Sequence, residues 1–138
     1  MTADPIERWH MLVKNRAIDQ LDDLLAEEVV FHSPIVHTPQ VGREISKLYL
    51  TAAVQVLGND QFQYVRQIVG QQEAVLEFTT ELEGIFINGI DLISWDEAGK
   101  IVEFKVMLRP LKAINLIHRL MAQMLAQFNP PPPDPNSD

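Results

Sequence analysis

The 138-residue sequence contains no cysteine, which excludes disulfide bonds, thiolate metal ligands and cysteine nucleophiles. Without cysteines the redox compartment is left open, and a cytoplasmic location is the default expectation. The N-terminal segment lacks an apolar run followed by a small-residue cleavage site, so it does not resemble a secretory signal. No stretch reaches the roughly 18 consecutive apolar residues that a membrane helix needs. We therefore expect a water-soluble protein that has no membrane partner.

Basic residues are also scarce, with 11 lysines and arginines against 19 acidic residues and a formal net charge of -8. They occur singly along the chain and form no basic cluster that would hold a phosphate backbone. We expect no nucleic-acid partner. The hydrophobic fraction of 46% and charged fraction of 22% are typical of a globular protein.

Motifs for several catalytic chemistries are absent as well. There is no G-x-S-x-G nucleophile turn, no Walker-type phosphate loop and no G-x-G-x-x-G dinucleotide loop. His32 and His37 lie five residues apart without a nearby carboxylate, which is not a zinc-binding spacing. The sequence predicts neither a metal site nor a cofactor.

Hydrophobic periodicity predicts an α+β protein in which helices come first and strands follow. Apolar residues repeat every three to four positions in the N-terminal half and alternate in the following segments. The predicted helices are a segment from Asp4 to about Lys14, then Ala17–Glu28, Arg43–Leu57 and Leu111–Phe128. The predicted strands are Val29–His32, Phe62–Val69, Glu73–Leu82, Phe86–Trp95 and Lys100–Arg109, with a loop at Ile35–Gly42. The last four strands are expected to form an antiparallel meander, and Leu111–Phe128 an additional C-terminal helix.

The chain length suits one domain, which we place at residues 1–128. Residues 129–138 include four consecutive prolines, which are incompatible with a helix or a central strand. We expect this segment to be a disordered tail without a function of its own.

The order of elements resembles that of the NTF2-like superfamily, a cone in which helices pack on a curved antiparallel sheet. Within it, the sequence resembles the SnoaL-like proteins and is similar to ketosteroid isomerases. The resemblance follows three segments, ERWHMLVKNRAIDQLDDLLAEEVVFHSP, GREISKLY and GIDLISWDEAGKIVEF. It implies a pocket for a small molecule between the helices and the concave face of the sheet.

The same resemblance implies positions for the pocket residues. The aspartate base of ketosteroid isomerases corresponds to Ser33, whose hydroxyl is too weak a base to abstract a proton from carbon. The tyrosine donor corresponds to Trp9, which keeps an aromatic wall and one N–H donor. The protonated aspartic acid corresponds to Asp91, and Tyr49 matches a further pocket tyrosine. Half of the isomerase machinery is therefore replaced.

Asp91 is a candidate catalytic residue because it stands between Ile90 and Leu92 with no cation nearby. If its side chain faces the cavity, loss of water raises its pKa and suits it to donate a hydrogen bond. Alternatively, it is a strand-end aspartate that binds a backbone amide. His32 and His37 are candidate general bases in place of the missing carboxylate. Alongside these, the predicted ligand-binding residues are Trp9, Ser33, Tyr49 and Phe104.

Two functional hypotheses follow. In the first, the protein binds a small apolar molecule and acts on it as an acid–base isomerase, cyclase or hydratase. In the second, it is a non-catalytic ligand-binding or dimerisation module of the same fold. Because Ile101–Leu108 has apolar residues on both faces, we expect a homodimer that forms through the sheet.

Overall fold

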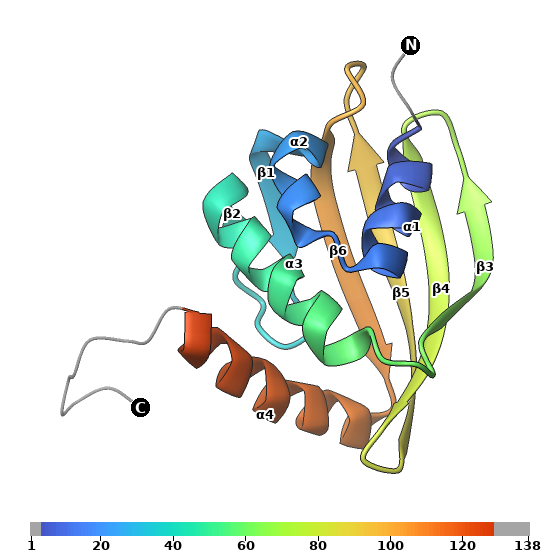
Figure 1. The fold of residues 1–138 in the computed structure, drawn as a ribbon, viewed down its shortest axis with the longest axis vertical. Helices are drawn as coiled ribbons and strands as arrows, with labels where there is room; N and C mark the ends of the chain where they lie inside the picture. The colour runs from blue at the N-terminus through green and yellow to red at the C-terminus, as the bar shows by residue number, and fades with distance from the viewer. Residues whose placement is uncertain (1–3, 129–138) are drawn as a thin grey trace, which may run out of the picture.

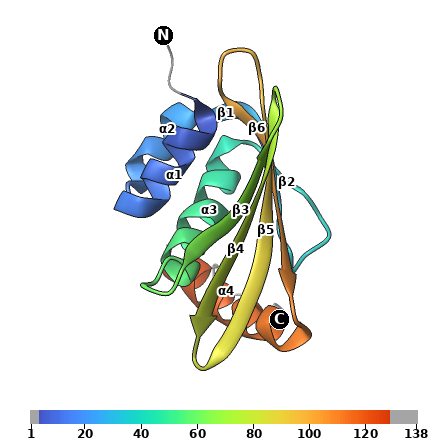
Figure 2. The same cartoon turned by 90° about the vertical axis from the view of Figure 1, so that its right-hand side faces the viewer.

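A computed structural model describes residues 4–128 of the protein, and the predicted tail at residues 129–138 lies outside this range. The elements follow in the order α1 (Pro5–Asn15), a 3-10 turn (Ile18–Gln20), α2 (Leu21–Leu24), β1 (Leu25–His32), β2 (Gln40–Val41), α3 (Arg43–Leu57), β3 (Gln63–Val69), β4 (Glu73–Leu82), β5 (Ile85–Trp95), β6 (Ile101–Arg109) and α4 (Leu111–Phe128). Helices α1 to α3 cover one face of a curved sheet, and α4 crosses below α3 (Figures 1 and 2). The predicted α+β architecture is confirmed.

The sheet has six strands in the order β2-β1-β6-β5-β4-β3. Strands β3 to β6 form the predicted antiparallel meander. The first strand differs from this pattern, because β1 lies parallel to β6 and makes the sheet mixed. Parallel neighbours need a long crossover connection, and the chain between β1 and β6, which contains α3, supplies it.

The largest difference from the predicted elements concerns the segment Ala17–Glu28, for which one helix was expected. The helical part ends at Leu24, and β1 begins at Leu25, which pairs with Ile101 of β6. The apolar spacing of this segment suits a helix, but pairing in the sheet outweighs that weak local preference. The predicted loop Ile35–Gly42 also contains β2, which pairs with β1 through Val30 and Phe31.

Helix α1 is held in place by its ends and by its apolar face. The Asp4 carboxylate accepts a hydrogen bond from the Ile6 amide at 2.8 Å, and Pro5 occupies the first turn. The helix buries Ile6, Trp9 and Leu12 against the rest of the protein. Its position therefore directs Trp9 toward the concave face of the sheet.

Strand β5 supplies the central wall of the concave face. Its buried positions alternate and include Ile87, Gly89, Asp91 and Ile93, so a carboxyl group occurs in an otherwise apolar series. A methyl group at Gly89 would lie 2.5 Å from the Phe78 ring and 2.8 Å from the Met107 carbonyl oxygen. The absence of a side chain at Gly89 thus allows the Phe78 ring to lie across β5 near Asp91.

In the described part of the chain, residues 4–128, no helix is both long and apolar enough to cross a membrane.

Candidate functional site

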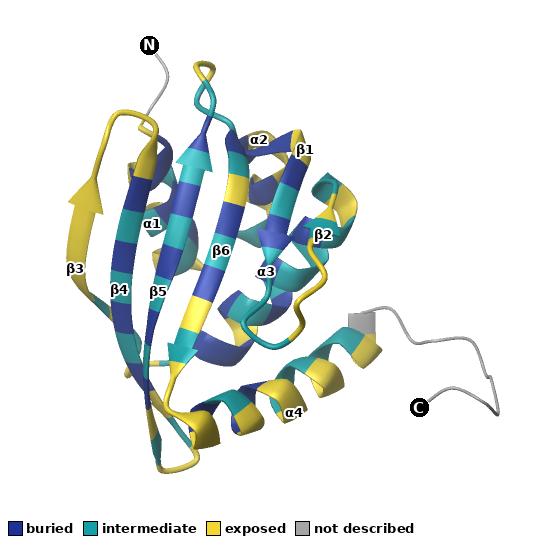
Figure 3. Ribbon diagram, turned by 180° about the vertical axis from the view of Figure 1, so that it is seen from behind, coloured by how far each residue is buried: buried dark blue, intermediate teal, exposed yellow. Residues whose placement is uncertain are grey.

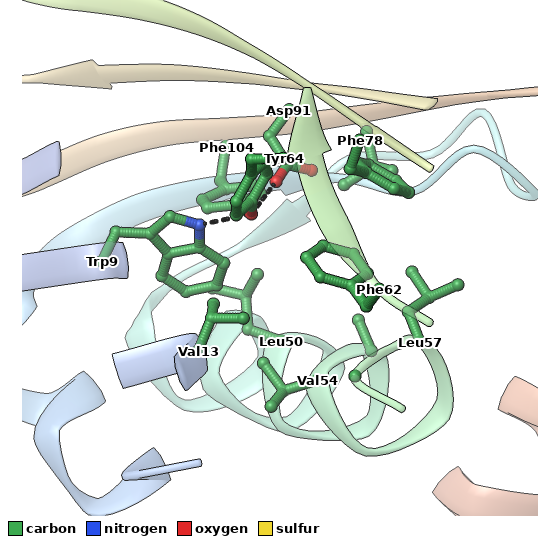
Figure 4. Close-up of a pocket in the computed structure, with 13 residues that line it drawn as sticks. Trp9, Val13, Leu50, Val54, Leu57, Phe62, Tyr64, Phe78, Asp91 and Phe104 are labelled. Atoms are coloured by element: carbon green, nitrogen blue, oxygen red, sulfur yellow. Dashed lines mark hydrogen bonds between the residues drawn. The ribbon is translucent and has the colours of Figure 1, made fainter. Parts of the chain in front are cut away.

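A small cavity lies between α1, α3 and the concave face of the sheet, with Asp91 in its wall (Figure 4). Its volume of about 30 Å³ is enough for roughly one water molecule. The lining is mostly apolar and comprises Trp9, Val13, Leu50, Ala53, Val54, Leu57, Gly58, Phe62, Tyr64, Phe78, Asp91, Phe104 and Val106. The only polar side-chain atoms in this wall belong to Trp9, Tyr64 and Asp91, and they are joined to one another.

These three side chains form a hydrogen-bonded chain. The Trp9 indole Nε1–H donates to the Tyr64 hydroxyl at 2.8 Å, and the Tyr64 hydroxyl lies 2.7 Å from Asp91 Oδ2 (Figure 4). Indole nitrogen is a donor only, so the Tyr64 oxygen is the acceptor in the first bond. The hydroxyl proton of Tyr64 is then directed to Asp91 Oδ2. The Trp9 donor therefore fixes the donor-to-acceptor direction of both hydrogen bonds.

The register of the sheet explains why Tyr64 and Asp91 meet. Tyr64 on β3 pairs with Phe78 on β4, and Phe78 pairs with Gly89 on β5, two residues before Asp91. Side chains two residues apart on a strand share a face, so Tyr64, Phe78 and Asp91 all project to the concave side. The Phe78 ring also contacts the edge of the Tyr64 ring, with centroids 6.2 Å apart.

Burial determines the protonation states of Asp91 and Tyr64. The Asp91 side chain is removed from water, which raises its pKa from 3.8 to about 7, although the hydrogen bond from Tyr64 acts in the opposite direction. Burial and the neighbouring Asp91 charge also raise the pKa of Tyr64 well above its ordinary value. Asp91 thus exchanges its proton near neutral pH, while Tyr64 stays protonated and continues to donate.

The second carboxyl oxygen of Asp91 faces a different environment. Within residues 4–128, Oδ2 has Tyr64 as its partner, whereas Oδ1 has no hydrogen-bond partner. No polar side-chain atom of the described residues is both fully buried and unpartnered, so Oδ1 retains contact with the cavity. Because Oδ2 accepts the Tyr64 proton, the carboxyl proton of neutral Asp91 resides on Oδ1. Asp91 presents a hydrogen-bond donor to the cavity when protonated and an acceptor when ionised.

A second, larger cavity of about 200 Å³ lies beneath α4. Its lining comprises Phe31, Ser33, Pro34, Ile35, Val36, Tyr49, Ala53, Leu57, Val106, Ile117, His118, Met121, Ala122 and Leu125. Ala53, Leu57 and Val106 line both cavities, so the two spaces adjoin at these side chains. The structure thereby divides the predicted ligand-binding residues, with Trp9 and Phe104 beside Asp91, and Ser33 and Tyr49 in the larger cavity.

His32 and His37 lie elsewhere. The His32 Nε2 atom is 2.8 Å from Glu103 Oε2, and His37 is exposed. Both histidines line a separate groove together with Lys105 and Met107, and neither lines the cavity that contains Asp91. Since Phe31 points into the protein, its neighbour His32 projects to the other face of β1. The structure does not bring these histidines together with Asp91.

The described residues contain no group of three or more histidine, aspartate or glutamate side chains that could hold a metal ion.

Sequence reasoning missed Tyr64, the direct partner of Asp91. A signal was available, because Phe62, which directly precedes β3, and Tyr64 are two residues apart in extended chain and so share a face. Phe62 and Phe78 stack with centroids 5.1 Å apart. The aromatic pair Phe62 and Tyr64, together with Phe78 on β4, the strand between β3 and β5, indicates an aromatic wall near the carboxyl group.

The sequence and the fold are similar to those of known proteins. A family model described as SnoaL-like domain matches residues 6–104. A steroid delta-isomerase from Pseudomonas aeruginosa has 32% sequence identity and a TM-score of 0.85, and the alignment covers 90% of each chain. A Silicibacter pomeroyi protein described as having a cystatin-like fold is 28% identical, with a TM-score of 0.79 over 86% of this chain and 83% of the other.

A Mesorhizobium loti protein described as NTF2-like is 18% identical and shows a similar fold, with a TM-score of 0.67 over 77% of this chain and 88% of the other. Among curated proteins, none matches the sequence significantly.

Proposed function

Because this chain belongs to the SnoaL-like domain family and has an NTF2-like fold, we propose that it binds a small, largely apolar molecule and acts on it through Asp91. The observation that carries the proposal is the buried Asp91 carboxyl group, which presents Oδ1 to an apolar cavity while Tyr64 occupies Oδ2. A buried carboxyl group is costly unless it has a partner or a task. A ligand oxygen placed at Oδ1 would supply the missing partner.

The chemistry that suits this arrangement is proton exchange with an oxygen atom of the ligand. With a pKa of about 7, Asp91 holds a proton or releases it within the physiological pH range. Isomerisation, cyclisation and hydration all need such an exchange, and the name of the steroid delta-isomerase relative supports the first of these. We assign the exchange to Asp91, since Ser33 is too weak a base and His32 and His37 line another groove.

Cavity size restricts the ligand. The two cavities measure about 30 and 200 Å³, whereas pockets for drug-sized ligands measure about 300–1,000 Å³. The ligand that we propose is therefore small, with one or two rings or a short chain. It carries an oxygen substituent that reaches Asp91.

A matched pair of small probes tests this proposal, namely the bicyclic ketone 1-tetralone and the corresponding hydrocarbon tetralin. At about pH 5, neutral Asp91 donates a hydrogen bond to the ketone oxygen, so we expect 1-tetralone to bind about tenfold more tightly than tetralin. At about pH 9, the ionised carboxylate repels that oxygen, and the preference is expected to disappear. Isothermal titration calorimetry measures both affinities.

The control is Asp91→Asn, whose amide group donates at every pH. This variant should keep a preference for the ketone but lose its pH dependence. A wild-type preference that is the same at both pH values would contradict a role for the Asp91 proton.

We also propose that the protein forms a homodimer through the outer face of its sheet (Figure 3). On this face Met107 is 48% exposed and pairs with Ile90, and Ile68 is 62% exposed and pairs with Val75. Exposed apolar residues whose cross-strand neighbours are also apolar are typical of protein interfaces.

The double substitution Ile68→Glu and Met107→Glu should convert a wild-type dimer to a monomer, because it places charges in the interface. Analytical ultracentrifugation measures the mass of both forms. Lys105→Glu, which reverses a charge on the same face without removing an apolar side chain, serves as a comparison for general electrostatic effects. A monomeric wild-type protein would rule this interface out.

A further inference from the structure

Helix α4 lies beyond residues 6–104, which match the family model, yet it forms one wall of the larger cavity. The helix is anchored near its start, where Ala113, Leu116 and Ile117 are buried, and it packs against α3 and β6. Further along, Met121 and Leu125 are half-buried and line the cavity. The space beneath α4 therefore depends on residues that the matched family segment does not include.

We propose that α4, through Met121, sets the size of the ligand by enclosing its apolar body, while the ligand oxygen passes Ala53 to reach Asp91. This inference rests on the proposed function and adds to it the compartment for the hydrocarbon part. It assigns Met121 as a residue that determines specificity.

The volume and lining of the larger cavity indicate the chemical class of the occupant. An apolar cavity of about 150 Å³ is known to hold benzene, and this cavity measures about 200 Å³. One or two hydrocarbon rings would therefore fit. The only polar side chains in its lining are Ser33, Tyr49 and His118. The Ser33 hydroxyl is already engaged, since it accepts a hydrogen bond from the Ile35 amide at 3.0 Å. The lining thus favours an apolar body over a polar or charged one.

The contact between the two cavities suggests the path of the ligand oxygen. Of the three residues that line both spaces, Leu57 and Val106 are buried, whereas Ala53 is half-buried and has the smallest side chain. Because its side chain is a single methyl group, Ala53 is the smallest obstacle between the larger cavity and Asp91. An oxygen substituent is small enough to occupy the cavity of about 30 Å³ beside the carboxyl group.

Met121 is suited to set the size limit because of its chemistry. Its unbranched thioether side chain adapts its shape to fill irregular apolar space. A larger residue at this position would occupy the compartment, and a smaller one would enlarge it. Changes at Met121 should therefore alter which hydrocarbon binds without altering the contact at Asp91.

The test is the affinity of tetralin, which has no oxygen, measured by calorimetry. Met121→Trp should weaken tetralin binding about tenfold or more, because the indole ring fills the compartment. Gln123→Trp places the same ring on the exposed side of α4 and should leave binding unchanged. As a second variant, Met121→Ala should shift preference from tetralin toward the three-ring hydrocarbon phenanthrene. Wild-type affinities for both hydrocarbons in both Met121 variants would overturn the inference.

The role of Ala53 is tested with the ketone. Ala53→Val should remove the preference for 1-tetralone over tetralin while tetralin itself still binds, because the two added methyl groups would fill the space between the two cavities. A preference that survives in Ala53→Val overturns the proposed path.

The two proposals fail separately. If Met121→Trp excludes tetralin but the wild type shows no pH-dependent preference for the ketone, the role of Asp91 and the path past Ala53 are wrong, and the role of α4 stands. If the preference is present but the Met121 variants bind as the wild type does, only the role of α4 is wrong.

Discussion

Replacing Asp91 by asparagine is expected to remove a loss of stability that the wild-type protein undergoes as the pH rises from about 4 to about 7. The pKa of Asp91 is raised from 3.8 to about 7 on folding, chiefly by burial. Between these values the folded protein binds a proton that the unfolded chain has released, so the free energy of unfolding falls as the pH rises. Each pH unit in this interval corresponds to about 1.4 kcal/mol, so the loss amounts to about 4 kcal/mol above pH 7.

Urea unfolding of both proteins at about pH 4 and about pH 8 measures this effect. Asparagine has no charged form and still accepts the hydrogen bond from Tyr64, so Asp91→Asn should match the wild type at the lower pH and exceed its stability at the higher pH. Other carboxyl groups titrate in both proteins and cancel in the difference. If the free energy of unfolding changes equally with pH in the two proteins, burial does not raise the pKa of Asp91.

Substituting Tyr64 by phenylalanine is the second change with a large expected effect. It leaves the Trp9 indole N–H and Asp91 Oδ2 without their partner in a buried site. Each unpartnered buried group costs about 1–3 kcal/mol, so we expect the protein to lose several kcal/mol of stability. The hydrogen bond from Tyr64 lowers the pKa of Asp91, and its removal should therefore raise that pKa further above 7.

Denaturant unfolding measures the first effect, and carbon NMR of the Asp91 carboxyl group during a pH titration measures the second. Tyr49→Phe is the matched control, because the Tyr49 hydroxyl makes no hydrogen bond to the other residues within 4–128 and packs instead on Phe31, with ring centroids 5.6 Å apart. It should cost less and leave the Asp91 titration unchanged. If both tyrosine variants lose equal stability, the chain from Trp9 to Asp91 contributes no more than ordinary packing.

Local sequence patterns predicted most of the secondary structure because the apolar periods are long and regular. The helix Arg43–Leu57, the strand Glu73–Leu82 and the helix Leu111–Phe128 have the predicted bounds. The pattern misled where helix and strand were both compatible with the apolar positions, as in the segment Ala17–Glu28. There the choice depends on whether Leu25 finds a partner, and that partner, Ile101, lies far along the chain.

The candidate site divides in the same way. Asp91 was recognisable from the sequence as a lone carboxyl group among alternating apolar residues. Burying such a group costs free energy, so its presence indicates a functional role or a hydrogen-bond partner. Its partner Tyr64 lies on another strand, 27 residues earlier in the chain, and no local pattern indicates which side chain will lie 2.7 Å from Oδ2. The separation of His32 and His37 from Asp91 also depends on which face of β1 each side chain occupies.

The sequence by itself determined most of the helices and strands, the family and the presence of a carboxyl group on the apolar side of β5, because these depend on residue type and on short-range periodicity. The tertiary structure decided the parallel position of β1, the hydrogen-bonded series from Trp9 through Tyr64 to Asp91, and the placement of two cavities that adjoin at Ala53, Leu57 and Val106. These features depend on strand register and on the packing of α4, which are contacts between residues distant in the sequence. The physical reason is that a pKa of about 7 for Asp91 arises from burial, and burial is a property of the folded protein as a whole.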